Sequence, residues 1–282
     1  PGSEDLKYAR LVANHLDTDH HEIIVSEQDF FNAIPEVIKS IESYDTTTVR
    51  ASVGNYLIAK WISKNSTAKV VFNGDGADEL MGGYLYFHKA PSATEFDSEC
   101  KRLLTDISKY DVLRSDRSIS SNGLEARTPF LDRKWVEFYL SINSNNRFHS
   151  VNGQCEKYLI RSAFEDCRPG FLPEKVLWRT KEAFSDGVSS LDKSWFQIIQ
   201  DNIILITQHD ENLNMCLQEL LNNEELFNRP KTLEQAYYRY LYEKNYAGCE
   251  ETIPYFWMPR FIEANDASAR TLNIYNERVK KG

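Results

Sequence analysis

Residues 69–84 read KVVFNGDGADELMGGY, and this stretch decides the fold. Its first part, Lys69–Phe72, is a compact apolar run of the kind found in a central parallel strand, where helices cover both faces of the sheet. Two glycines and three carboxylates follow at once, and a helix is predicted to begin after them. Because ligands of open α/β sheets bind beyond the carboxyl ends of the strands, the sequence predicts a ligand-binding turn here.

The residue types of this turn indicate its chemistry. Glycines let the main chain approach a ligand closely, and the free amides can donate to it. Carboxylates at such a turn commonly hold Mg²⁺, which prefers oxygen ligands. Three familiar loops do not fit: the GxxxxGK[ST] pattern is absent, a dinucleotide fingerprint needs glycine at Glu79, and a calcium loop needs glycine at Asp78. A plain acidic surface turn remains an alternative.

Outward from this turn, the first 80 residues predict an α/β arrangement with crossover helices. Ser3 caps a helix, and a short strand rich in β-branched residues follows at His21–Val25. Ser26 opens a second helix, which Pro35 kinks or splits in two. A further helix at Ala51–Ser63 then precedes the strand described above.

Beyond Pro91 the strand signals nearly vanish, and long amphipathic helical stretches take over. These stretches are residues 95–115, 134–141, 155–167, 195–205, 215–226 and 232–242. We therefore expect two parts packed together. Residues 1–92 form an α/β sheet with crossover helices, and residues 93–282 form a mainly helical part.

The composition limits the function classes. Hydrophobic residues make up 41% of the 282 residues, as in a globular protein, and no apolar run reaches the roughly 20 residues that cross a bilayer. The formal net charge of −9 argues against general binding to nucleic acid or anionic membranes, although a local basic pocket could still hold ATP. The five cysteines are scattered without a CxxC pair, which favours reduced thiols in a cytoplasmic protein.

Three further motifs carry candidate site residues: YDTTTVRAS at 44–52, NGLEARTPFLD at 122–132 and WRTKEAFSDG at 178–187. In the last of these, Arg179 and Lys181 could clamp a phosphoryl group, since fixed cations stabilise the charge that develops there. Taken singly, each motif also fits a plainer interpretation. In the order of the motifs, these plainer interpretations are a capped helix with a surface arginine, a structural salt bridge and a solvated turn.

Taken together, these motifs and the run GGYLYFHKAP at 82–91 resemble the glutamine-hydrolysing asparagine synthetase family. The order and spacing agree from Pro1 to about Arg278, and the run at 83–91 is specific to that family rather than to ATP enzymes in general. The resemblance is to the C-terminal synthetase domain. It implies a parallel α/β sheet like that of the PP-loop ATP pyrophosphatases, incomplete here, with a large and mainly helical C-terminal part.

The resemblance also implies an activity. Members of the family join a glutaminase, whose first residue is a catalytic cysteine, to a synthetase that activates the side-chain carboxylate of aspartate with Mg-ATP. The products are β-aspartyl-AMP and pyrophosphate, and ammonia from glutamine then displaces AMP to give L-asparagine. The expected cofactors are ATP and Mg²⁺, and a homodimer is left open. A non-catalytic binding or scaffold descendant and a related amidotransferase, such as a β-lactam synthetase, remain alternatives.

The family's roles carry over to matching positions of this chain. Asp75 matches a glutamate that is critical for forming and using the acyl-adenylate, and Lys181 offsets charge on the phosphoryl groups. Asp78 matches the ligand of Mg-pyrophosphate. The residues expected at the nucleotide are Asn73, Gly74, Gly76, Asp78 and Arg50, with Glu125 and Arg127 in supporting places.

Three departures from the family pattern weaken these assignments. The SGGxDS loop that wraps the pyrophosphate lies upstream of the matching segment, so we expect the sheet to be incomplete and ATP binding to be weak. Asn73 stands where the family usually has serine, and Asp75 stands where it has glutamate. The shorter side chain retreats by roughly 1 Å, and a misplacement of that size can lower a rate by roughly 10²-fold.

Overall fold

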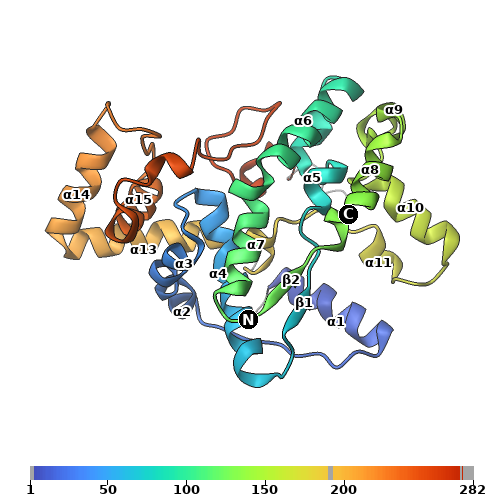
Figure 1. Cartoon of the computed structure of the whole chain (residues 1–282), viewed down its shortest axis with the longest axis horizontal. Helices are drawn as coiled ribbons and strands as arrows, with labels where there is room; N and C mark the ends of the chain where they lie inside the picture. Colours follow the sequence, from blue (N-terminus) through green and yellow to red (C-terminus); the bar gives the residue numbers. More distant parts are fainter. Residues whose placement is uncertain (1–2, 190–192, 274, 276–282) are drawn as a thin grey trace.

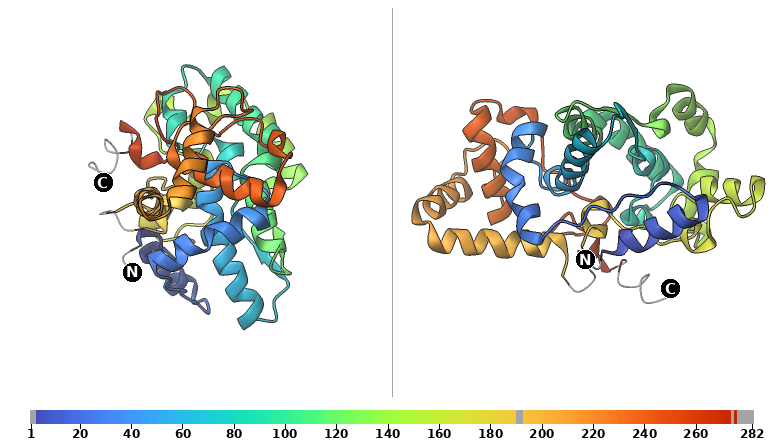
Figure 2. Two further views of the ribbon diagram at one scale, coloured as in Figure 1. Left: turned by 90° about the vertical axis from the view of Figure 1, so that its left-hand side faces the viewer. Right: turned by 90° about the horizontal axis from the view of Figure 1, so that it is seen from below.

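The computed structural model of the chain describes residues 3–189, 193–273 and 275. The described part is mostly helical and contains a two-stranded parallel sheet near its centre (Figure 1). The helices α13–α15 lie at one end of the molecule and α8–α11 at the other (Figure 2). In that part of the chain, no helix is long and apolar enough to cross a membrane.

The sheet pairs β1 (Val70–Phe72) with β2 (Glu125–Arg127) in parallel, with Val71 opposite Ala126. The first strand was predicted, but the second was not. In the sequence, the motif that contains β2 also fitted a structural salt bridge. The side chains of Glu125 and Arg127 do form an ion pair, at 2.6 Å, on the exposed face of the sheet. The sheet therefore takes one strand from each side of the predicted division at residue 92.

The prediction that the first strand is buried was wrong. The side chains of Val70 and Phe72 are 44% and 75% exposed. Successive side chains of a strand point to opposite faces, and one face of this sheet is covered. On that face, Val71 packs with Ala59 of α4 and Ile119 of α7. No described helix covers the opposite face in the same way, so its apolar side chains meet solvent.

The predicted strand at His21–Val25 does not form. Residues 18–26 have no regular secondary structure, and no described strand pairs with them. β-branched residues favour extended main chain, but a strand also needs a neighbour for its amide and carbonyl groups. Ile24 is exposed accordingly.

The first helices are α1 (Glu4–Leu16), α2 (Glu27–Asn32), α3 (Ile34–Ile41) and α4 (Thr46–Asn65). The hydroxyl of Ser26 accepts from the amide of Asp29, and Pro35 lies at the start of α3, so both predictions there are confirmed. Helix α4 begins five residues earlier than predicted because the Asp45 carboxylate accepts from the amide of Thr48 at 2.9 Å and caps it. Ser3 is a different case, since its hydroxyl donates to the carbonyl of Gly187 instead of capping α1.

The remaining described elements are mostly helical. The α-helices are α5 (Ala77–Met81), α6 (Ala93–Asp106), α7 (Asp111–Ser120), α8 (Arg133–Ser141), α9 (Ser144–Arg147), α10 (Tyr158–Cys167), α11 (Glu174–Leu177), α12 (Phe184–Gly187), α13 (Trp195–His209), α14 (Glu211–Asn222) and α15 (Leu233–Tyr246). Short 3₁₀ turns are η1 (Leu85–Lys89), η2 (Ile107–Lys109), η3 (Pro129–Leu131), η4 (His149–Asn152), η5 (Glu250–Thr252) and η6 (Ala269–Thr271).

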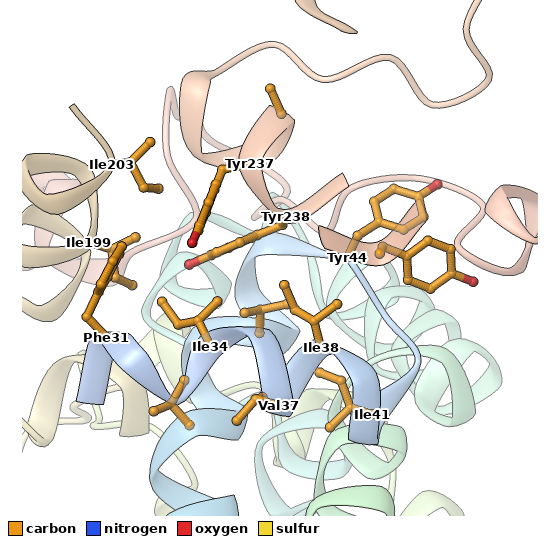
Figure 3. Packing of buried hydrophobic residues seen from close by; sticks show 14 of the residues in the cluster. Phe31, Ile34, Val37, Ile38, Ile41, Tyr44, Ile199, Ile203, Tyr237 and Tyr238 are labelled. Carbon is orange, nitrogen blue, oxygen red and sulfur yellow. The ribbon is translucent and has the colours of Figure 1, made fainter. Parts of the chain in front are cut away.

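The largest buried cluster joins α3 to α13 and α15 (Figure 3). Four apolar residues of α3 recur at helical spacing and are completely buried; they are Ile34, Val37, Ile38 and Ile41. They pack against side chains of α13 and α15, among them Ile199 and Tyr238. A second cluster, built around Phe87 and Phe96, supports the turn that follows α5. These two clusters fix the elements that surround the predicted ligand-binding turn.

Candidate active site

A pocket of about 380 Å³ lies where β1 ends. Its walls come from α4, the turn after β1, α7 and the segment 181–185. Five of the predicted site residues line it together, namely Asn73, Gly74, Asp75, Asp78 and Lys181. Two of the predicted residues, Gly76 and Arg50, do not line it.

The turn after β1 is held by Asn73. Its amide donates to the carbonyl of Arg127 at 3.0 Å, which extends the pairing of the two strands by one residue. Its side-chain oxygen accepts from the amide of Asp75 at 3.2 Å, and its side-chain amide donates to the Ser115 hydroxyl at 2.6 Å. Gly76 adopts a φ of +87°, and an added Cβ would lie 2.3 Å from Leu131, so glycine lets the turn close against η3.

Asp78 lies between two lysines in the first turn of α5. Its two carboxylate oxygens accept from Lys157 Nζ at 2.5 Å and from Lys181 Nζ at 2.9 Å. Burial favours the neutral carboxyl, but the two ammonium groups outweigh it and hold the pKa of Asp78 well below its ordinary value. Asp78 is therefore charged at neutral pH and fixes the position of both cations.

Lys157 was not predicted from the sequence. It lies directly before α10 and has a φ of +58°. Its ammonium contacts Asp78, but Lys157 is not among the residues that line the pocket. A bulky residue in this left-handed conformation costs roughly 1–3 kcal/mol, and such residues cluster at functional sites. Nothing in the residues around Lys157 marks it in the sequence, because the contact joins residues that are 79 positions apart.

Gly83 provides the space for the Asp78 carboxylate, and its substitution gives a first prediction. A Cβ at Gly83 would lie 1.9 Å from Oδ1 of Asp78 and 2.9 Å from its Cα. We expect Gly83→Ala to lower the free energy of unfolding by about 1–3 kcal/mol, as overpacking does elsewhere. Gly74→Ala is the matched control, since its Cβ would have no atom within 4 Å. Urea unfolding of both variants tests this, and an equal stability of the two would contradict it.

Asp75 is held by Arg114 of α7. Oδ1 of Asp75 accepts from Nη2 of Arg114 at 3.2 Å, and Arg114 also binds Asp111 at 3.0 Å. The hydroxyl of Tyr84 contacts the carboxyls of both Asp111 and Glu79. Burial and the nearby charge of Asp111 raise the pKa of Glu79 well above its ordinary value. Tyr84, Asp111 and Arg114 line the pocket, and Glu79, which does not line it, contacts the Tyr84 hydroxyl.

Lys181 enters the pocket as predicted, but Arg179 does not. The Lys181 ammonium donates to Asp78 and, at 2.8 Å, to the carbonyl of Glu182. The guanidinium of Arg179 instead pairs with Asp5 of α1 at 2.8 Å and lies 3.9 Å from the centre of the Tyr8 ring. The hypothesis of a clamp made of both cations is therefore wrong, because Arg179 pairs with Asp5 of α1 instead of entering the pocket.

Arg50 lies in a buried ion-pair network away from the pocket. Its guanidinium makes two hydrogen bonds to Glu234 of α15, at 2.7 and 2.6 Å. It makes two more to Asp266, at 2.6 and 2.8 Å. With four donated hydrogen bonds and 3% exposure, Arg50 is not among the residues that line the pocket, and its predicted contact with the nucleotide stays a prediction. Glu125 and Arg127, predicted in supporting places, also lie outside the pocket lining.

Asp186 of α12 gives a second prediction, on pH dependence. Burial raises its pKa from 3.8 to about 6, although two hydrogen bonds from the Ser268 hydroxyl act against this. Between these pH values the folded state keeps a proton that the unfolded chain releases, so this contribution is complete below pH 3.8 and is lost as the pH rises through about 6.

Asp186→Asn cannot titrate at this position. We therefore expect its stability relative to the wild type to rise by up to about 3 kcal/mol between pH 4 and pH 7, since each pKa unit corresponds to about 1.4 kcal/mol. Urea unfolding across this range is the measurement. Asp201→Asn, at an exposed ion pair, is the control for the loss of a surface carboxylate. A flat difference between Asp186→Asn and the wild type would contradict the prediction.

The pocket fits Mg²⁺ only together with a phosphate ligand. In the described residues, no group of three or more histidine, cysteine or acidic side chains could hold a metal ion by itself. Mg²⁺ usually keeps several waters and binds one or two carboxylates together with substrate phosphates, and Asp78 offers one such carboxylate in the pocket. The donor set is therefore suited to a metal that arrives with a polyphosphate.

Comparison with known proteins gives one consistent family. The family model described as asparagine synthase matches residues 1–97 and 91–228. The chain is 47% identical over 279 residues to the asparagine synthetase [glutamine-hydrolyzing] of Gallus gallus, 46% over 281 residues to that of Mus musculus and 44% over 278 residues to that of Homo sapiens. These alignments cover 99% of this chain and 48% of each relative, so the chain spans about half the length of the curated relatives it matches. The chain therefore belongs to the asparagine synthase family.

Proposed function

We propose that the protein carrying this chain makes L-asparagine from L-aspartate and ATP through β-aspartyl-AMP, with ammonia from glutamine. The observation that supports this best is the arrangement of Asp78 between Lys157 and Lys181 where β1 ends. That arrangement combines a carboxylate for Mg-pyrophosphate with a fixed cation for the phosphoryl groups. The similar proteins of Gallus gallus and Homo sapiens are named for this activity.

The same proposal includes the fold. We propose that β1 and β2 belong to a parallel sheet of the PP-loop ATP-pyrophosphatase type, with residues 1–92 as its α/β part and 93–282 as the helical part. The parallel pairing of the two strands and the ligand pocket beyond the end of β1 support this assignment.

Three charged side chains of the pocket, those of Asp75, Asp78 and Lys181, would have roles in this reaction. A carboxylate is a poor acyl donor, and adenylation gives it a good leaving group. Bound Mg²⁺ would neutralise charge on the phosphoryl oxygens, and Asp78 would hold it. Lys181 would stabilise the charge that develops during adenylation, because its ammonium is fixed in place by Asp78 and the carbonyl of Glu182. Asp75, held by Arg114, would take the place of the family glutamate.

The apolar side of the pocket would protect the intermediate. Ile58 and Ala59 of α4, with Phe184 of α12, are among its apolar lining residues. Gly54 lets Phe184 approach α4, since a Cβ there would lie 2.9 Å from the ring. Excluding water in this way would allow ammonia, rather than water, to displace AMP.

Product analysis tests the proposal. The complete natural protein, incubated with aspartate, Mg-ATP and glutamine or ammonium, should release AMP and pyrophosphate in a one-to-one ratio with asparagine. Reactions without aspartate are the control and should form no AMP. Formation of ADP and phosphate would contradict the proposed acyl-adenylate. Nucleotide binding without any turnover would favour a non-catalytic descendant.

We also propose a cytoplasmic location. Cys100, Cys167, Cys216 and Cys249 form no disulfide bond in the described part of the chain, as expected for reduced thiols.

A further inference from the structure

The segment near the C-terminus of the described chain, residues 266–273 and 275, makes a set of contacts with the segment that carries Lys181. We call it the C-terminal strap. Arg270 Nε donates to Oε1 of Glu182 at 2.8 Å, and the Tyr275 hydroxyl donates to Oε2 of the same carboxylate at 2.8 Å. The Ser268 hydroxyl donates to Asp186, four residues further along, at 2.8 Å. Three side chains of the strap thus hold the segment 182–186.

These contacts are shielded from solvent. The side chains of Arg270 and Glu182 are 9% and 10% exposed, and Ser268 and Asp186 are buried. Hydrogen bonds to ionised groups are strong and geometrically specific, and shielding from water keeps them so. The strap therefore holds the Glu182 carboxylate in one defined position.

The other contacts of the strap reach α4 and η1. Leu272 and Tyr275 pack against Leu85 of η1, which directly follows Tyr84 of the pocket lining. Asp266 pairs with Arg50 of α4, the helix that supplies Thr47 and Ala51 to the pocket wall. No described residue of the strap lines the pocket itself. The strap is therefore connected to two parts of the pocket wall, α4 and the segment that follows Lys181, and is not part of the pocket surface.

We propose that the C-terminal strap is a positioning element that sets the distance between Lys181 and Asp78. The coupling runs through Glu182, because this residue directly follows Lys181 and its carbonyl accepts from the Lys181 ammonium at 2.8 Å. A change in the anchoring of Glu182 by Arg270 moves both ends of that contact. The inference rests on the proposed function of Lys181 for its effect on rate, but not for its effect on structure.

The size of the effect follows from the geometry of transfer reactions. A misplacement of about 1 Å can lower a rate by about 10²-fold even when the altered residue lies far from the chemistry. Removal of Arg270 should therefore lower kcat by about 10²-fold and change KM for ATP by less than about threefold. A purely structural role would instead lower stability and leave kcat of the folded protein unchanged.

Arg147 provides a matched control. It is a buried arginine that pairs with Asp97 and donates to the carbonyl of Ile142 at 2.9 Å, and it is not among the residues that line the pocket. Arg147→Met removes the same charge from a similar environment. It should lower the melting temperature to a similar degree as Arg270→Met and leave kcat within about twofold of the wild type.

The experiment compares Arg270→Met, Arg270→Lys and Arg147→Met in the complete natural protein. Of the two methionine variants, we expect only Arg270→Met to have a lower kcat. Arg270→Lys should have an intermediate kcat, because a lysine keeps the charge but not the guanidinium geometry. Hydrogen exchange of the amides at 181–187 should accelerate in Arg270→Met and not in Arg147→Met. Equal kcat values for the two methionine variants would overturn the proposal.

The outcome can be separated from the proposed function. If the wild type forms no AMP from aspartate and ATP, the proposed function fails, and hydrogen exchange alone then decides on the strap. Unchanged exchange at 181–187 in Arg270→Met would overturn the strap proposal whether or not the protein is active. Accelerated exchange confined to that segment and the residues around Asp78 would support it.

Discussion

Lys181→Met should lower the rate of AMP formation by about 10³-fold, the largest effect on activity that the structure predicts. Removal of a preorganised group that stabilises developing charge commonly lowers kcat by 10²–10³-fold, and loss of a cation at a transferring phosphoryl group can cost 10³-fold or more. The Lys181 ammonium is suited to this role because Asp78 at 2.9 Å and the Glu182 carbonyl at 2.8 Å hold it in the pocket. Methionine keeps an unbranched apolar side chain and removes the ammonium together with its contacts to Asp78 and the Glu182 carbonyl.

Two further lysines make this test specific. Lys157→Met removes the other partner of Asp78 from outside the pocket lining, so we expect weaker binding of Mg-ATP with a smaller loss of kcat. Lys175→Met, at an exposed position of α11, is the control and should behave like the wild type. Rates are measured as AMP release with saturating aspartate and ATP. If the rate of AMP release in Lys181→Met fell by less than tenfold, Lys181 would have no role in stabilising the developing charge.

Arg50→Met should lower the free energy of unfolding by about 3–5 kcal/mol, the largest effect on stability. The substitution leaves the carboxylates of Glu234 and Asp266 without their cation, and the side chain of Glu234 is only 1% exposed. An uncompensated buried charge is far more costly than the loss of a surface pair. Two neighbours, the Tyr238 hydroxyl at 2.9 Å and the Gln200 amide at 3.3 Å, still donate to Glu234 but carry no positive charge.

The same variant also tests the contact between Arg50 and the nucleotide that the family resemblance implies. Lys101→Met, at the solvent-exposed pair with Asp97, is the control and should cost about 1 kcal/mol or less in urea unfolding. At a temperature where Arg50→Met is fully folded, its affinity for Mg-ATP should lie within about threefold of the wild type. A large loss of affinity for Mg-ATP with little loss of stability would instead indicate that the Arg50 guanidinium contacts the nucleotide.

Local patterns in the sequence were sufficient for much of the fold. The hydroxyl cap at Ser26 and the break at Pro35 report interactions between residues a few positions apart, and the structure confirms both. The turn from Asn73 to Asp78 was predicted for the same reason. Asn73, Gly74, Asp75 and Asp78 are neighbours in the chain, so their common place in the pocket follows from local geometry. The family motifs identified the domain on which the proposed function rests.

The partners of the charged residues were decided only by the tertiary structure. Lys157 meets Asp78 across 79 positions, and Arg50 meets Glu234 across 184 and Asp266 across 216. The strand β2 forms for a similar reason, since three residues with two exposed charges become a strand only beside β1. An ion pair or a strand pair gains its energy from two segments at once. A pattern in one segment cannot therefore show which partner the fold will supply.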